Sequence, residues 1–237
     1  MLLTAAEINV LKTRAGRLNK LSKINNAQSY LEIGVAKGFT FNKVNINRKV
    51  GVDPKFRFDT SQFSSESVSF YETTSDNYFA RDVSASQIFD LVHIDGLHTF
   101  EQTIRDFCAS LVHAHPRTIW LIDDTRPESY AQADRSQDRC QKIKSYTNEN
   151  NGKWMGDVFK VVAFIHDFFP QYSFANFPDH GQTVVWRKTR TDFRPQWDSM
   201  EKIERLSFAD FLDQQQGIFK QQSYENILNI IERDLRT

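Results

Sequence analysis

The segment that most constrains this chain is a short apolar run that ends in an acid and enters a glycine-punctuated turn. It reads Ser29-Tyr30-Leu31-Glu32-Ile33-Gly34-Val35-Ala36-Lys37-Gly38. A second apolar run that ends in an acid follows, Lys49-Val50-Gly51-Val52-Asp53. A glycine turn lets the backbone approach a ligand, and a carboxylate on the next strand end suits ribose hydroxyls. The pair is typical of α/β proteins that hold an adenosine-containing cofactor.

Composition excludes several classes of partner. The 237 residues carry 30 Lys and Arg against 30 Asp and Glu, so the formal net charge is zero and we expect no nucleic-acid partner. The N-terminus lacks a secretory pattern, and no uncharged apolar stretch is long enough for a bilayer, so we expect a cytoplasmic protein without a membrane partner. Cys108 and Cys140 form no CxxC pair and are expected to be free thiols in helices.

Strand and helix patterns alternate through the middle of the chain. Short apolar runs predict strands at 30–33, 49–52, 68–71, 89–94 and 118–122, with helical stretches such as 100–114 between them. Two further strands, 172–175 and 183–187, flank a polar loop at 177–182 that suits a hairpin. We expect an α/β fold with a Rossmann-like, seven-stranded, mostly parallel sheet, an antiparallel last strand and helices on both faces.

Helical extensions flank this region. Residues 1–25 predict one amphipathic helix, in which Thr4 and Glu7 have capping-box spacing. The C-terminal tail contains two helix patterns, Ser207–Gln215 with Ser207 as a candidate cap, and Ser223–Leu235 with a strong apolar face. Asp157 is a candidate cap of a helix over 158–168. We therefore divide the chain into an N-terminal helical extension at 1–27, a central domain at 28–189 and a C-terminal helical extension at 190–237. Three roles are open for the tail: covering the sheet edge, forming a lid, or pairing with a second subunit as a homo-oligomer.

The glycine turn has an unusual spacing, acid-x-Gly-x-x-x-Gly over Glu32, Gly34 and Gly38. A pyrophosphate is expected to use Gly-x-Gly-x-x-Gly at a helix N-terminus. The observed spacing puts a carboxylate at the strand end, which better suits a cationic or hydroxyl-rich ligand. Asp53 stands at the next strand end, where a ribose diol would be held. The alternative is an ordinary strand-to-helix turn, with Asp53 as a turn residue before Pro54.

Acidic residues end two further strands. Asp95 follows one apolar run, with His98 three residues later, and Asp123 and Asp124 end another. Because parallel strands open onto one crevice at their carboxyl ends, we expect these side chains to converge. Close carboxylates raise one another's pKa unless a cation lies among them, and Mg²⁺ prefers such oxygen ligands. The alternative is that each residue only caps a turn or a helix.

With these motifs in place, residues 28–188 resemble the class I S-adenosylmethionine-dependent methyltransferases. The resemblance rests on the segments at 31–38 and 51–53, on Phe70-Tyr71-Glu72-Thr73-Thr74-Ser75-Asp76, and on Asp90-Leu91-Val92-His93-Ile94-Asp95-Gly96-Leu97-His98. More narrowly, Asp95-Gly96-Leu97-His98 and Asp123-Asp124 are similar to motifs of the metal-dependent sugar O-methyltransferases of the macrolide-tailoring type. The stretch Trp154-Met155-Gly156-Asp157-Val158 also resembles bacterial relatives, without a chemical role that we can give it.

The resemblance implies a role for each matching residue. The cofactor S-adenosylmethionine would contact Glu32, Gly34, Gly38, Asp53, Ser75 and Asp76, of which the last two lie near the adenine. Mg²⁺ would be bound by Asp95, Asp123 and Asp124, and His98 would be the general base. The implied reaction is methyl transfer to a hydroxyl of a small molecule, such as a sugar or another diol.

Two alternative functions remain open from the residues alone. One is a nicotinamide-dependent oxidoreductase on a Rossmann sheet, against which the missing Gly-x-Gly-x-x-Gly argues. The other is a non-catalytic cofactor-binding partner protein, against which the acids and the histidine argue. The methyl acceptor itself is not specified by the sequence.

Overall fold

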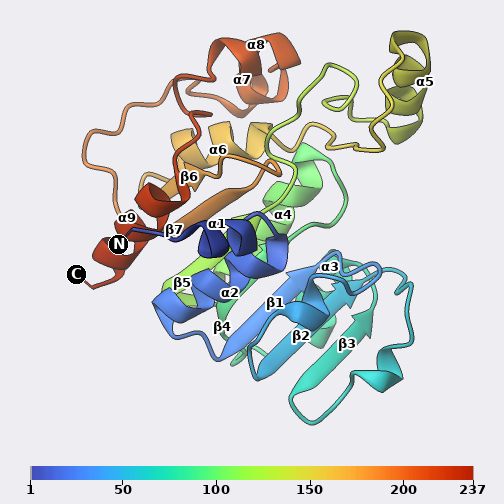
Figure 1. Cartoon of the computed structure of the whole chain (residues 1–237), viewed down its shortest axis with the longest axis vertical. Helices are drawn as coiled ribbons and strands as arrows, with labels where there is room; N and C mark the ends of the chain where they lie inside the picture. The colour runs from blue at the N-terminus through green and yellow to red at the C-terminus, as the bar shows by residue number, and fades with distance from the viewer. Residues whose placement is uncertain (1, 237) are drawn as a thin grey trace.

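The computed structural model describes residues 2–236, which form a seven-stranded sheet surrounded by helices (Figure 1). The strand order is β3-β2-β1-β4-β5-β7-β6. The strands are β1 (Ser29–Ile33), β2 (Arg48–Asp53), β3 (Val68–Glu72), β4 (Phe89–Ile94), β5 (Ala114–Ile122), β6 (Tyr172–Asn176) and β7 (Thr183–Arg187). All seven predicted strands are confirmed, and β5 begins four residues earlier than predicted.

The direction of the strands matches the predicted topology. Strands β1 to β5 pair in parallel, whereas β7 runs antiparallel to both β5 and β6. The polar loop between β6 and β7 is closed by the Phe177 amide, which donates to the Gln182 carbonyl at 2.9 Å. The Rossmann-like sheet with an antiparallel last strand is therefore confirmed.

Each face of the sheet carries its own hydrophobic core, because successive strand side chains point to opposite faces. On β1, Leu31 and Ile33 belong to one core and Tyr30 to the other. The first core is completed by side chains of α4 (Phe100–Leu111), α6 (Lys160–Phe168), α7 (Met200–Glu204) and α8 (Phe208–Asp213). The second is completed by α1 (Ala5–Leu11), α2 (Arg14–Asn25) and α9 (Tyr224–Leu235). Two further helices are α3 (Ser75–Asn77) and α5 (Gln137–Thr147).

The N-terminal segment forms two helices, so the prediction of a single helix over 1–25 was wrong. The capping box of Thr4 and Glu7 is present, but α1 ends at Leu11. Thr13 then caps α2, because its hydroxyl accepts from the Gly16 amide at 3.0 Å and donates to the Val10 carbonyl at 2.8 Å. A threonine that satisfies free backbone groups on both sides favours a helix boundary over a continuous helix. Arg14 thereby becomes the first residue of α2.

The C-terminal helix α9 packs its apolar face against one face of the sheet rather than along its edge. Ser207 caps α8 as predicted, and Ser223 caps α9. Ile227, Leu228 and Ile231 of α9 are buried in the same core as α2. Figure 1 shows α1, α2 and α9 gathered at this side of the molecule. Homo-oligomer formation through the terminal helices stays a prediction.

A buried arginine joins these terminal helices. Arg17 of α2 is fully buried, and its Nε donates to the Leu11 carbonyl at 2.8 Å. Its two terminal nitrogens donate to Gln182 and, at 3.0 Å, to the Tyr224 hydroxyl, and the guanidinium pairs with Asp179. Breaking such a buried ion pair leaves an uncompensated charge and is costly. The start of α2 is therefore held firmly against the sheet and α9.

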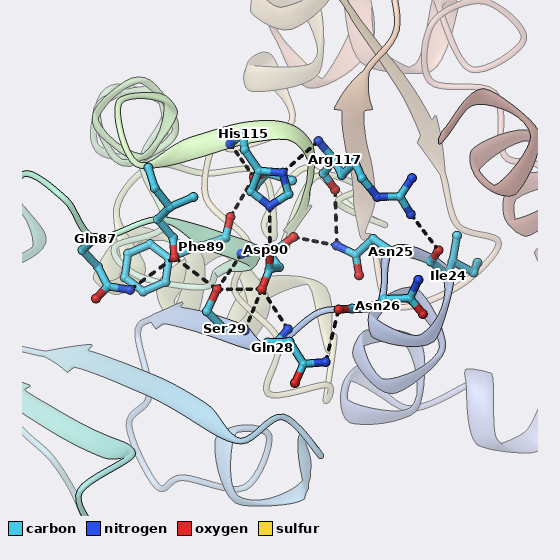
Figure 2. A network of polar contacts seen from close by, with 12 residues as sticks. Ile24, Asn25, Asn26, Gln28, Ser29, Gln87, Phe89, Asp90, His115 and Arg117 are labelled. Atoms are coloured by element: carbon cyan, nitrogen blue, oxygen red, sulfur yellow. Dashed lines mark hydrogen bonds and ion pairs between the residues drawn. The ribbon is translucent and has the colours of Figure 1, made fainter. Parts of the chain in front are cut away.

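The amino ends of β1, β4 and β5 are joined by a polar network around Asp90 (Figure 2). One Asp90 oxygen accepts from the Gln28 and Ser29 amides and from the Ser29 hydroxyl, each at 2.8 Å. The other lies 2.7 Å from His115 Nε2. Because the Arg117 amide donates to His115 Nδ1, a neutral His115 carries its proton on Nε2 and donates it to Asp90. The network aligns β1, β4 and β5.

Two minor expectations can be compared directly with the structure. Both cysteines are free, with Cys108 in α4 and Cys140 in α5. Within residues 2–236, none of the helices has the length and apolar character needed to cross a membrane.

Candidate active site

A cavity of about 620 Å³ opens at the carboxyl ends of β1, β2 and β4. One end is lined by Asp53, Ser75 and Asp76, and the other by Asp95 and His98. Residues predicted to bind the cofactor and residues predicted to carry the chemistry therefore share one cavity. The size lies within the range of small-molecule sites.

The glycine turn reaches the cavity through its first glycine. Gly34 has a φ of +89°, and a Cβ there would overlap the Asp95 carbonyl, so only glycine fits where the turns after β1 and β4 meet. Gly38, with a φ of +72°, lies outside the cavity lining, where a Cβ would contact Phe58 and Asn42. Ala36 lines the cavity with a φ of +47°, which the sequence did not reveal.

Asp53 connects the glycine turn to β2. One carboxylate oxygen accepts from the Ala36 amide and the other from the Lys55 amide, each at 2.8 Å. A carboxylate offers about four lone-pair positions, so this one keeps acceptor capacity for ribose hydroxyls. Asp53 thus both shapes the turn and faces the cavity.

Glu32 lies beneath the cavity and outside its lining, with 2% of its surface exposed. It accepts a hydrogen bond of 2.5 Å from the Tyr30 hydroxyl, and His93 Nδ1 lies 3.9 Å from its other oxygen. Burial lowers the pKa of His93, but the surrounding carboxylates, Glu32 first among them, raise it more. The structure therefore places Glu32 in a buried polar layer, and its direct contact with a cofactor stays a prediction.

The predicted adenine end contains an acid that the sequence reading missed. Gln102 of α4 donates to Ser75, to Asp76 and, at 2.9 Å, to Asp106. Asp106 is 2% exposed and lines the cavity. Burial raises the pKa of Asp106 to about 6. Ser75, Asp76 and Asp106 therefore form one polar wall held by Gln102.

The three predicted metal ligands all lie at the other end of the cavity or directly beneath it. Their ligand atoms fall into two compact groups, one with His93, Asp95 and Asp123, the other with Asp95, His98 and Asp124, each within 4.8 Å. Burial and the charge of Asp123 raise the pKa values of Asp95 and Asp124 well above the usual range. Such repulsion between buried carboxylates is relieved by a cation.

Arg14 already brings one positive charge to this cluster. Its Nε pairs with Asp123 Oδ2, and its Nη1 lies 3.8 Å from Asp95 Oδ2. Burial lowers the pKa of Arg14, but the carboxylates of Asp123 and Asp95 raise it more, so the guanidinium stays charged. Residue 14 belongs to the N-terminal extension, and nothing in its sequence context pointed to the site.

His98 is oriented by the segment that begins at Trp154. Its Nδ1 lies 2.7 Å from the Trp154 carbonyl, and the two rings stack at 4.9 Å between centroids. A carbonyl only accepts, so Nδ1 carries a proton and a neutral His98 has its lone pair on Nε2. Nε2 faces the acidic cluster, 3.1 Å from Asp124 Oδ2 and 3.8 Å from Asp95 Oδ1. A contact of 3.1 Å between Nε2 and a carboxylate oxygen needs a proton between the two atoms, so Nε2 can accept a proton from another group only when this contact with Asp124 is broken.

The rest of this segment fits closely around His98. Gly156 has a φ of +61°, and a Cβ there would overlap the His98 carbonyl. Asp157 accepts from the Phe100 amide at 2.8 Å and so caps α4, the helix that follows His98. The prediction that Asp157 caps the next helix was wrong, because that helix begins at Lys160 without a side-chain cap. The segment at 154–158 thus gains a structural role.

The donor set fits a hard divalent cation. Asp123 and Asp124 each belong to a compact group of ligand atoms that includes Asp95. A single guanidinium balances only part of the charge of these three carboxylates. Oxygen ligands of this kind suit Mg²⁺. The residues that would hold the ion are Asp95, Asp123 and Asp124, provided that Arg14 leaves Asp123.

Comparisons with known proteins agree with this arrangement. Residues 31–125, which contain the end of β1, all of β2 to β5 and every predicted site residue, match a family described as a methyltransferase domain. No curated protein matches the sequence.

Solved structures share the fold at low sequence identity. An O-methyltransferase from Bacillus cereus in complex with SAH superposes with a TM-score of 0.54 at 16% identity, covering 79% of this chain and 93% of that one. The O-methyltransferase TomG from Streptomyces achromogenes, involved in tomaymycin synthesis and in complex with SAM, gives 0.51 at 14%, covering 79% and 82%. Cofactor-bound Rv0187 from MTB gives 0.51 at 14%, covering 78% and 88%.

The family match defines residues 31–125 as a methyltransferase domain, and the chain shares its fold with solved O-methyltransferases. Both findings agree with the resemblance drawn from the sequence. Neither comparison favours the nicotinamide-dependent oxidoreductase or the non-catalytic partner protein.

Proposed function

We propose that this protein is an S-adenosylmethionine-dependent O-methyltransferase that acts on a hydroxyl of a sugar or another small diol-bearing molecule, with assistance from Mg²⁺. The single observation that carries the proposal is the orientation of His98. Its Nδ1 is engaged by a backbone carbonyl, and its Nε2 faces carboxylates at the end of the cavity that Gly34 and Asp53 also line. The named O-methyltransferases that share the fold support the same reaction class.

The cofactor end of the cavity would be formed by Gly34, Asp53, Ser75 and Asp76, with Gly38 shaping the turn. Gly34 admits a ligand close to the backbone, and Asp53 offers acceptors to ribose hydroxyls. S-adenosylmethionine, when bound there, supplies a methyl group already activated by its sulfonium. The protein is left with the tasks of orienting the acceptor, removing its proton and excluding water.

At the acidic end, His98 would act as the general base. His98 Nε2 would take the proton of the acceptor hydroxyl, and S-adenosylmethionine would supply the methyl group. The Trp154 carbonyl keeps the second ring nitrogen protonated, so the base presents the correct atom. Mg²⁺ held by Asp95, Asp123 and Asp124 would lower the pKa of a diol hydroxyl.

The test is methyl transfer from S-adenosylmethionine to a panel of diol-bearing sugars, with and without Mg²⁺. His98→Ala should keep cofactor affinity, measured by calorimetry, and lower turnover by about 10²–10⁴. Tyr146→Ala is the control, because Tyr146 is 79% exposed on α5 and lies outside the cavity lining. Parent turnover in His98→Ala would remove the histidine from the mechanism, and activity that chelation leaves unchanged would remove the metal.

A further inference from the structure

We propose that Arg14 is an internal counter-ion that a divalent cation must displace from Asp123 in order to bind. The inference rests on the proposed function, because it concerns the same acidic end of the cavity. It assigns a role to the N-terminal helix pair, which lies outside the matched methyltransferase domain.

Both oxygens of Asp123 are engaged. Oδ1 accepts from the Asp124 amide at 2.9 Å, and Oδ2 pairs with Arg14 Nε. Asp123 is almost fully buried, so neither oxygen can turn toward solvent to meet an ion. A cation can therefore use Asp123 only after the guanidinium has left.

The arrangement of ligand atoms leads to the same conclusion. The two compact groups each contain Asp95, but one lacks Asp124 and the other lacks Asp123. With Arg14 in place, the three carboxylates are divided between a side that faces the arginine and a side that faces His98. Removing the guanidinium frees the carboxylate that both sides need to form one ligand shell.

Only the side chain of Arg14 has to move. The backbone is fixed on either side, by the cap at Thr13 and by the buried hydrogen bonds of Arg17. The Arg14 side chain is 40% exposed and lies at the cavity wall, so it has solvent to rotate into. Metal binding is then coupled to a rotamer change rather than to opening of the helix pair.

Charge explains why the two cations exclude each other. A guanidinium and a divalent ion on the same carboxylate repel strongly at distances of a few ångströms in a partly buried site. Without metal, Arg14 relieves part of the repulsion among the three acids. The arginine therefore stabilises the metal-free protein and weakens its affinity for metal.

The experiment measures Mn²⁺ affinity by electron paramagnetic resonance, without cofactor or acceptor. Arg14→Gln should bind Mn²⁺ about tenfold more tightly than the parent or better. Arg14→Lys, which keeps the charge, should stay within about threefold of the parent. Lys12→Gln is the matched control, since it removes the same charge from an exposed position two residues away and should leave the affinity unchanged.

A measurement on the unaltered protein covers the case in which Arg14→Gln does not fold. Adding Mg²⁺ should separate the Arg14 Nε–H group from Asp123. The exchange of this proton with water, observed by NMR, should then become faster. Unchanged exchange at saturating Mg²⁺, or equal Mn²⁺ affinity in the parent and Arg14→Gln, overturns the inference. If no variant binds Mn²⁺, both the inference and the metal part of the proposed function fail. Tighter Mn²⁺ binding without methyl transfer to any diol would reject the proposed reaction and keep the role of Arg14.

Discussion

Replacing Gly156 by alanine tests how far the backbone around Trp154 controls His98. Gly156 has a φ of +61°, which an alanine adopts at a cost of roughly 1–2 kcal/mol. The added Cβ would also fall closer to the His98 carbonyl than the 3.0 Å that such atoms keep in real proteins. The two segments must therefore separate.

The size of that separation sets the expected effect. A shift of about 1 Å would stretch the 2.7 Å contact between His98 Nδ1 and the Trp154 carbonyl beyond hydrogen-bond length. The His98 ring then loses the carbonyl that fixes its tautomer and its orientation. A misplacement of this size costs about 10²-fold in rate. Gly156→Ala should therefore lower kcat by about 10²-fold while S-adenosylmethionine affinity changes little, because Gly156 lies outside the cavity lining.

The assay compares kcat, cofactor affinity by calorimetry and unfolding free energy across the parent and three variants. Gly152→Ala is the matched control in the same segment, since a Cβ there meets nothing within 4 Å. Trp154→Phe keeps the backbone carbonyl and an aromatic ring beside His98 but loses the indole hydrogen bond to the Asp134 carbonyl, so its kcat should fall less than that of Gly156→Ala. Parent kcat in Gly156→Ala would refute the reasoning, as would a loss of cofactor affinity as large as the loss of kcat.

Two predictions concern stability against pH. Because burial raises the folded pKa of Asp106 to about 6, the unfolded chain ionises first, and the residue destabilises the fold increasingly between about pH 4 and pH 6. Asp106→Asn should thus be more stable than the parent by up to about 3 kcal/mol above pH 7, and a difference in denaturant unfolding that persists at pH 4 would contradict this. Burial raises the pKa of Asp90, but hydrogen bonds from Gln28, Ser29 and His115 lower it by more, so the net pKa is below its usual value. The ionised Asp90 therefore stabilises the fold near neutral pH, and this stabilisation is lost as the pH falls. Asp90→Asn should lower the unfolding free energy at pH 7 by about 1.5 kcal/mol or more, and an equal loss at pH 3 would argue against the charge.

The sequence determined the sheet and the ends of its strands. Short β-branched and aromatic runs with acids behind them fix where strands begin and end, because strand formation and turn chemistry are largely local. The parallel topology then brings Asp53, Asp95 and Asp124 to one edge without further information. The helix caps at Thr4, Ser207 and Ser223 follow from the same local chemistry.

Only the tertiary structure decided what those acids meet. Arg14 reaches Asp123 because Thr13 breaks the N-terminal helix locally and Arg17 holds α2 against the sheet. The contacts of Arg14 with Asp123 and of Arg17 with Gln182 join residues more than a hundred positions apart. Trp154 presents a carbonyl, which the sequence cannot identify as a partner of His98, since every residue has one. Local propensity therefore specified the elements and their order, whereas long-range packing set the counter-ions and hydrogen-bond partners on which the chemistry depends.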